Sequence, residues 1–304
     1  YEATILNARI RKAYLQNKTK IISFNDVGDL TYPYESLNGD IENIKKITED
    51  NHEISSLIKN AKNPLIIFGK SSLNSKSAKY IFESIKSFLK KNGKISEEWN
   101  SLNVISENAS TVGSFDLGLY KTEDGSNEVL KDLENHKFEI VYLLGLDSFK
   151  FEKKDEFIIY QGSHGDKGAE MADIILPGAA YTEQNGYFTN LEGKLQKAYK
   201  ASYPPEDAKE DWAVINELAE AMNHRKLFND KDELDSSLLN QINLYIEKNK
   251  SIKSSDFKDL KFDQEIIKLC SEDYYYSNVI ARASKTMLDC KSAKTNLRST
   301  GTEG

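Results

Sequence analysis

The sequence has little cysteine, and its two thiols lie far apart. Cys270 and Cys290 are the only cysteines among the 304 residues, and no CxxC pair occurs. An iron–sulfur cluster takes about four thiolate ligands, so these two residues alone cannot hold one. We predict that both are free thiols in a reducing compartment.

Long hydrophobic runs and an excess of basic residues are also missing. Hydrophobic residues make up 39% of the chain, and no apolar run approaches the length of about 20 residues that a membrane-spanning helix needs. The net charge is −7, and no basic stripe with interleaved aromatic residues occurs. We therefore predict no direct membrane insertion and no nucleic-acid partner.

No initiator methionine, signal peptide or other targeting segment is present at the start of the sequence. The chain opens at Tyr1, inside a stretch whose apolar spacing predicts a helix over residues 3–15. We expect the sequence to be a piece of a longer protein, with any localisation signal lying upstream.

The familiar catalytic motifs are absent too. Gly69-Lys70-Ser71 has the ending of a phosphate-binding P-loop, but Pro64 stands where that loop needs its first glycine. No G-x-G-x-x-G dinucleotide-binding pattern, G-x-S-x-G nucleophile pattern or H-E-x-x-H zinc-binding pattern occurs. The four histidines are His52, His136, His164 and His224. We predict no catalytic residue and no metal site.

Short, continuous apolar runs are what the sequence does contain. They lie at residues 20–24, 65–68, 102–105, 140–144, 157–160 and 173–176. Amphipathic helical patterns separate several of them, as at residues 78–89. Continuous runs are typical of strands buried on both faces, so we predict an α/β fold with a mostly parallel, Rossmann-like sheet flanked by helices. Ligands of such sheets bind at the carboxyl ends of the strands.

The sequence changes character after Pro204-Pro205, where helical and irregular stretches follow. We predict three regions. Residues 1–45 end a preceding α/β unit, residues 46–203 form the main α/β domain, and residues 204–304 form a helical, irregular C-terminal appendage with a frayed tail.

A glycine-rich loop follows the predicted strand 157–160. Its glycines, Gly162, Gly165 and Gly168, permit positive φ angles and close backbone approach, so the loop suits either ligand binding or a tight structural crossover. Further polar residues downstream need hydrogen-bond partners if they are buried, and either hold the chain in shape or contact a ligand. They are Glu183, Asn190 and Glu192.

Two stretches carry a family resemblance. The run H-G-D-x-G-A-x-x-A-D-x-I-L-P-G-A-A-Y-T-E spans His164 to Glu183, and N-x-E-G-x-x-Q spans Asn190 to Gln196. The sequence resembles molybdopterin oxidoreductases. Among these it looks most like the large iron–sulfur subunits of respiratory complex I in the mitochondrial and alphaproteobacterial form. The resemblance implies a molybdopterin-oxidoreductase-like fold.

The resemblance also has implications for cofactors. In cofactor-bearing relatives the loop equivalent to Ser163–Gly168 lies near the pterin and commonly carries threonines. The loop of this sequence has none. The family's cluster cysteines lie upstream. We therefore expect no cofactor in this segment, and 2Fe–2S and 4Fe–4S clusters in the full-length subunit. The expected vestige of the cofactor site is Gly162, His164, Gly165, Asp166, Gly168, Asp173, Glu183, Asn190 and Glu192.

The function implied is that of a scaffold in the peripheral arm of a proton-pumping NADH:quinone oxidoreductase. Its partners would be other peripheral-arm subunits, on the cytoplasmic side of a bacterial inner membrane or the matrix side of the mitochondrial one. Two alternatives remain open. One is the C-terminal half of a genuine molybdopterin-dependent oxidoreductase, and the other is an α/β module that binds an anionic small molecule at residues 162–168.

Overall fold

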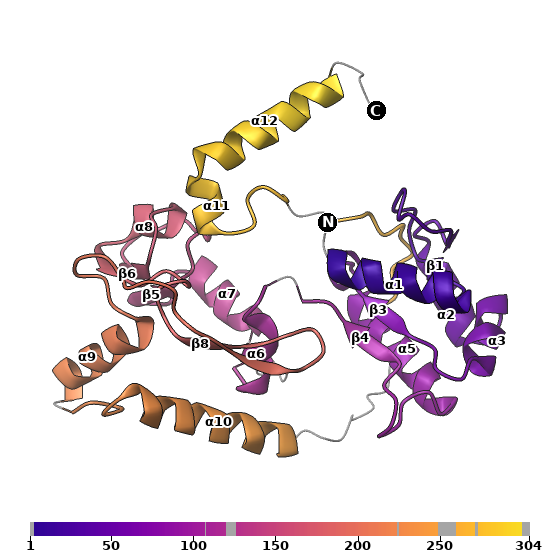
Figure 1. Cartoon of the computed structure of the whole chain (residues 1–304), viewed down its shortest axis with the longest axis horizontal. Coiled ribbons are helices and arrows are strands. Elements are labelled where there is room, and N and C mark those ends of the chain that lie inside the picture. Colours follow the sequence, from indigo (N-terminus) through magenta and orange to yellow (C-terminus); the bar gives the residue numbers. More distant parts are fainter. Residues whose placement is uncertain are drawn as a thin grey trace. The chain divides into compact units, whose positions relative to one another are not determined.

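The computed structural model describes residues 3–106, 108–119, 126–223, 225–248, 260–270 and 273–299 (Figure 1). His224 lies outside these residues. The chain divides into two compact units, residues 1–108 with 251–272 and residues 109–250 with 273–304. The three regions predicted from the sequence have other boundaries than these two units, and they stay a prediction. Among the described helices, none has the length and hydropathy needed to cross a membrane.

The first unit is built from short helices and two small parallel sheets. Its elements are α1 (Thr4–Asn17), β1 (Ile22–Ser23), β2 (Glu35–Ser36), α2 (Ile41–Thr48), α3 (Glu53–Asn60), β3 (Ile66–Phe68), α4 (Lys70–Leu73), α5 (Ala78–Lys91) and β4 (Leu102–Val104). Strand β1 pairs with β2 and β3 pairs with β4, both in parallel.

Helix α5 supplies much of the core of this unit, as its apolar spacing predicted. Ile81, Ile85 and Leu89 recur on one face and are buried against Phe68 of β3. The helix ends just before Gly93, which adopts a φ of +66° that glycine tolerates without steric cost.

Residues 260–270 return to this first unit from far along the chain. The Ile267 side chain is buried in its core, and the Ile267 N–H donates to the Gly39 carbonyl over 2.9 Å. The Phe262 ring packs edge-on against Tyr80, with 4.9 Å between the ring centroids. Helical periodicity is a local signal, so it could not indicate this return.

The second unit carries the glycine-rich loop. Its elements are α6 (Thr111–Asp116), α7 (Ser126–Glu134), β5 (Ile140–Leu144), β6 (Phe157–Gly162), α8 (Lys167–Met171), β7 (Ile174–Pro177), β8 (Gly186–Thr189), β9 (Leu195–Ala198), α9 (Asp211–Asn223), α10 (Lys231–Lys248), α11 (Val279–Ala283) and α12 (Lys285–Ser299). Strands β5, β6 and β7 form a parallel sheet in that order, and β8 and β9 form an antiparallel hairpin.

One face of the β5–β6–β7 sheet holds the core of the second unit. Leu143, Ile158 and Tyr160 are buried there and pack against partly buried residues that include Ala169 and Met171 of α8. Strand β7 ends at Pro177, because proline cannot donate a ladder hydrogen bond.

The α/β fold class with mostly parallel pairing is confirmed, but the burial of the strands differs from expectation. Continuous apolar runs predicted strands covered on both faces. In the described residues Ile140 is 64% exposed and Ile174 is 45% exposed. An apolar run shows that a strand can be buried, whereas its actual cover depends on elements distant in sequence.

Candidate functional site

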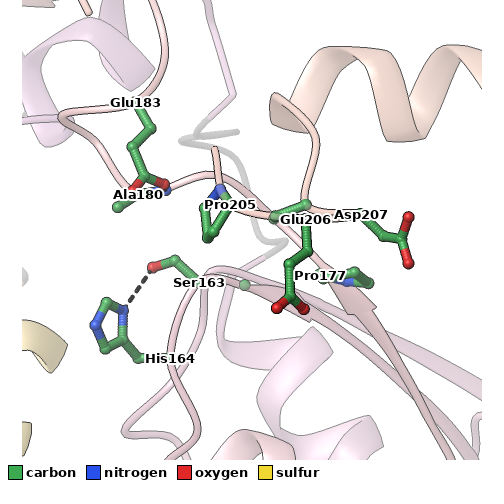
Figure 2. A pocket seen from close by; sticks show the side chains of 11 residues that line it. Ser163, His164, Pro177, Ala180, Glu183, Pro205, Glu206 and Asp207 are labelled. Carbon is green, nitrogen blue, oxygen red and sulfur yellow. Dashed lines mark hydrogen bonds between the residues drawn. The ribbon is translucent and has the colours of Figure 1, made fainter. Parts of the chain in front are cut away.

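A cavity of about 500 Å³ opens at the carboxyl ends of β6 and β7, where the fold predicts a site (Figure 2). One wall is Gly162–His164, directly after β6, with Pro177 and Gly178 at the end of β7. The opposite wall is Ala180, Glu183 and residues 205–208.

The opposite wall is held in place by backbone hydrogen bonds. The Ala179 N–H donates to the Lys209 carbonyl over 2.8 Å, and the Lys209 N–H donates back to the Pro177 carbonyl over 3.2 Å. Glu183 closes the turn at residues 180–183, because its carboxylate accepts the Ala180 N–H over 2.9 Å. Residues 205–208 were predicted to start an appendage, and sequence reasoning missed that they face the glycine loop.

A buried polar network lies beside the strand ends. Gln161 is fully buried, and its amide donates to the Asp211 carboxylate over 2.9 Å while its carbonyl oxygen accepts the Tyr142 hydroxyl. The Gln184 amide donates to the other Asp211 oxygen over 3.0 Å. A Cβ atom on Gly178 would lie 2.8 Å from Asp211 Oδ1, so glycine is required there. The network therefore ties β5, β6 and α9 together.

The glycine loop is packed tightly against Tyr160. The Tyr160 hydroxyl donates to the His164 carbonyl over 2.8 Å, and a Cβ on Gly162 would collide with the same hydroxyl and ring. A Cβ on Gly168 would lie 2.5 Å from the Leu146 carbonyl oxygen. Burial raises the pKa of the Tyr160 phenol, so its proton stays in place as a donor at neutral pH. Two of the three loop glycines thus serve close packing.

Asp166 links this loop to the C-terminal part of the chain. Its carboxylate accepts the Lys167 N–H over 2.8 Å at the start of α8 and the Arg282 Nε–H over 2.7 Å. Arg282 also donates through Nη2 to Asp147 over 2.6 Å. The Arg282 hydrogen bond, and then the Lys167 N–H, lower the pKa of Asp166. No role for Arg282 or Asp147 followed from the sequence.

The other predicted polar residues hold the backbone elsewhere. Asp173 lies just before β7, at the end of the sheet remote from the cavity, and accepts the Ile158 N–H and the Lys153 ammonium over 2.8 and 2.7 Å. These two donors, in that order, lower the pKa of Asp173. Asn190 accepts two backbone N–H groups over 2.9 Å and so closes the β8–β9 hairpin that carries Glu192.

The structure therefore separates the nine predicted residues. Gly162, His164 and Glu183 line the cavity, whereas the other six do not. The six are Gly165, Asp166, Gly168, Asp173, Asn190 and Glu192. His164 sits next to Ser163, with 3.0 Å between its Nδ1 and the hydroxyl oxygen. Over the described residues, no group of three or more His, Cys, Asp or Glu is arranged to hold a metal ion. Cys270 and Cys290 are both free and exposed, and the reducing compartment predicted for them stays a prediction.

The electrostatics of the cavity do not fit a pterin cofactor. The acidic residues Glu183, Glu206 and Asp207 are among its lining residues, and the described part of the chain contributes no lysine or arginine to the lining. The pterin cofactor of molybdopterin enzymes carries a phosphate group. The negative charges of the acidic lining residues would repel that phosphate. A ligand with cationic or neutral hydrogen-bonding groups would fit the acidic lining of this cavity better.

Comparisons with known proteins agree with the fold. The family model described as "Molybdopterin oxidoreductase" matches residues 1–221. The chain is 36% identical over 96% of its length to the NADH-ubiquinone oxidoreductase 75 kDa subunit of Reclinomonas americana, and 36% identical over 98% to a subunit of the NADH-quinone oxidoreductase of Rickettsia bellii. It is 33% identical over 97% to the mitochondrial NADH-ubiquinone oxidoreductase 78 kDa subunit of Neurospora crassa. The matched part is 43%, 43% and 40% of these relatives, so the chain spans less than half their length.

Proposed function

This chain belongs to the molybdopterin oxidoreductase family, and on that premise we propose that it is a structural part of the large subunit of an NADH:quinone oxidoreductase. The observation that carries the proposal is the likeness to proteins of that name, which extends over 95–98% of the chain. The whole enzyme would pass electrons from NADH to quinone, and residues 1–304 would carry none of them.

The state of the glycine loop supports a scaffold role. In a cofactor site, loop groups are left for the ligand, whereas here Asp166 is bonded to Arg282 and the His164 carbonyl to Tyr160. Gly162 and Gly168 leave no room beside Tyr160. We infer that the shape of a former cofactor site persists because hydrogen bonds and close packing within the loop stabilise it. Gly165 and the remaining predicted residues would then be remnants of that former site.

The cofactors, partners and location follow from the same proposal. The 2Fe–2S and 4Fe–4S clusters would be bound by parts of the full-length subunit other than residues 1–304. The partners would be other subunits of the peripheral arm. The subunit would associate with the cytoplasmic side of a bacterial inner membrane or with the matrix side of the mitochondrial one.

One alternative has an observation in its favour. The molybdopterin oxidoreductase model matches residues 1–221, so a pterin-dependent enzyme remains the second candidate. The acidic lining of the cavity argues against it. The same carboxylates disfavour a module for anionic small molecules.

Metal analysis of the native assembly tests the proposal. The full-length protein would be affinity-purified from the membranes of its source organism. Molybdenum, tungsten and iron would then be quantified per polypeptide, together with NADH:quinone activity. We expect iron, NADH:quinone activity and no stoichiometric molybdenum or tungsten. Stoichiometric molybdenum or tungsten would establish the pterin enzyme instead, and material without NADH-oxidising activity would contradict membership in such a complex.

A further inference from the structure

Three tyrosines are exposed on the segments that border the cavity. Tyr181 is 62% exposed, Tyr199 is 75% exposed and Tyr203 is 78% exposed. Tyrosine is among the residues most enriched at the energetic centres of protein interfaces, because it offers a large rigid ring and a hydroxyl. An exposed group of them beside a cavity is therefore a candidate docking surface.

A backbone contact joins the chain segments that carry these tyrosines. The Thr182 carbonyl accepts the Ala201 N–H over 2.8 Å, which holds the turn after Tyr181 against the segment between Tyr199 and Tyr203. Ala180, which precedes Tyr181, and Pro205, two residues after Tyr203, line the cavity itself. We call this the tyrosine–carboxylate surface, made of Tyr181, Tyr199, Tyr203, Glu183, Glu206 and Asp207.

The charge of this surface is negative and comes from several segments. Figure 2 shows the Glu206 carboxylate extending towards the strand ends between Ser163 and Pro177, the Glu183 carboxylate beside Ala180, and the Asp207 carboxylate turned away from both. Among the described residues of the lining, His164 is the remaining ionisable group. The Glu183 and Glu206 carboxylates lie on opposite sides of Pro205 (Figure 2). They therefore provide hydrogen-bond acceptors at two places for a long side chain that enters the cavity.

The neighbouring lysines do not neutralise this surface, because each pairs with a carboxylate outside it. The Lys200 ammonium lies 3.1 Å from Glu210, and Lys209 lies 2.7 Å from Glu217. Lys200 also lies 4.8 Å from the centre of the Tyr203 ring. That contact occupies one side of the Tyr203 ring, and it shows that a tyrosine of this surface attracts a cation, the kind of interaction that a basic partner can make with Tyr181.

We propose that the tyrosine–carboxylate surface docks a basic polypeptide segment of a neighbouring subunit. A lysine or arginine side chain of that segment enters the cavity, and its charged end meets Glu183 and Glu206. The flanking residues of the segment pack on Tyr181 and Tyr203. The inference rests on the proposed scaffold function, and it names the kind of partner that this scaffold holds.

Two measurements on the full-length protein test the docking. In hydroxyl-radical footprinting, we expect Tyr181 and Tyr203 to be labelled in the isolated subunit and protected about tenfold in the assembly. We also expect the double charge reversal Glu206→Lys/Asp207→Lys to lower co-purification of partner subunits about tenfold or more, because like charges placed opposite one another disfavour association.

A matched control separates docking from a general effect of charge. Asp155→Lys/Glu220→Lys makes the same change of net charge at two exposed positions of the second unit. We expect this variant to co-purify with partners like the unmodified protein. Circular dichroism of both isolated variants checks that they fold, and a variant that is unfolded is replaced by Glu206→Gln/Asp207→Asn, for which a smaller loss is expected.

The outcomes distinguish the two proposals. Equal labelling of Tyr181 and Tyr203 in both states, or equal co-purification of the charge-reversed and control variants, overturns the docking inference and leaves the scaffold function standing. A full-length protein that co-purifies with no NADH-oxidising complex overturns both.

Discussion

Arg282 Nε donates to an Asp166 carboxylate oxygen over 2.7 Å, so a residue near the end of the chain fixes the glycine loop that borders the cavity. The same guanidinium holds Asp147, which follows β5. Because Asp166 also begins α8, the contact joins the strand ends, the loop and the C-terminal helices of the second unit into one structure.

Removing this guanidinium should open the loop. In Arg282→Ala, Asp147 and Asp166 lose their charged donor, and hydrogen bonds to charged groups contribute about 1.5–3 kcal/mol. We expect the Gly168 and Glu170 amides to exchange hydrogen about 10- to 100-fold faster, as local opening of that size predicts. Lys285→Ala, which changes an exposed cation nearby, serves as control. Equal exchange in the two variants would show that Arg282 does not hold the loop.

The loop glycines should differ in their tolerance of a methyl group. Gly168→Ala places a Cβ 2.5 Å from the Leu146 carbonyl oxygen, and we expect a loss of about 1–3 kcal/mol of stability from overpacking. Gly165→Ala meets no atom within 4 Å and should be close to neutral. Thermal unfolding of the full-length protein compares the two. A Gly165→Ala variant as unstable as Gly168→Ala would refute this account of the loop.

The buried amide of Gln161 should be costly to replace. Gln161→Met keeps similar bulk but leaves the Tyr142 hydroxyl and one Asp211 oxygen without their partner, and an unsatisfied buried group costs about 1–3 kcal/mol. Gln196→Met changes an exposed glutamine of β9 and should stay within about 0.5 kcal/mol of the unmodified protein. Denaturant unfolding measures both, and similar midpoints for the two variants would rule out a stabilising network.

Glu156 should make part of the stability depend on acid pH. The Lys154 N–H and the backbone N–H of Glu156 itself, followed by the His136 ring, lower the pKa of this carboxyl from 4.5 to about 2. A folded-state pKa below the unfolded one means that its contribution is complete above the unfolded value, about pH 4.5, and is lost as the pH falls towards 2.

The variant Glu156→Gln removes that titration. Between about pH 6 and pH 2 its melting temperature should fall less than that of the unmodified protein. Glu220→Gln, at an exposed position of α9, should behave like the unmodified protein. Parallel melting curves for Glu156→Gln and the unmodified protein across this range would contradict the assignment.

Much of the fold could be predicted because its signals are local. The apolar runs at residues 65–68, 140–144 and 157–160 became β3, β5 and β6 with small shifts at their ends, and the spacing of Ile81, Ile85 and Leu89 placed α5. The family resemblance carried by residues 164–183 is confirmed by the relatives and the family model. The list of candidate site residues stays a prediction, since the geometry shows where they lie and not what they bind.

Local sequence patterns were enough to predict the α/β class, the positions of the principal elements and the family, since strand runs, helix spacing and a long motif are each contained within a few tens of residues. The contact of Arg282 with Asp166, the packing of residues 260–270 into the first unit, and the approach of residues 205–208 to the glycine loop became visible in three dimensions alone. These contacts join residues far apart in the chain. Their partners are chosen by packing and charge in three dimensions, which no local pattern encodes.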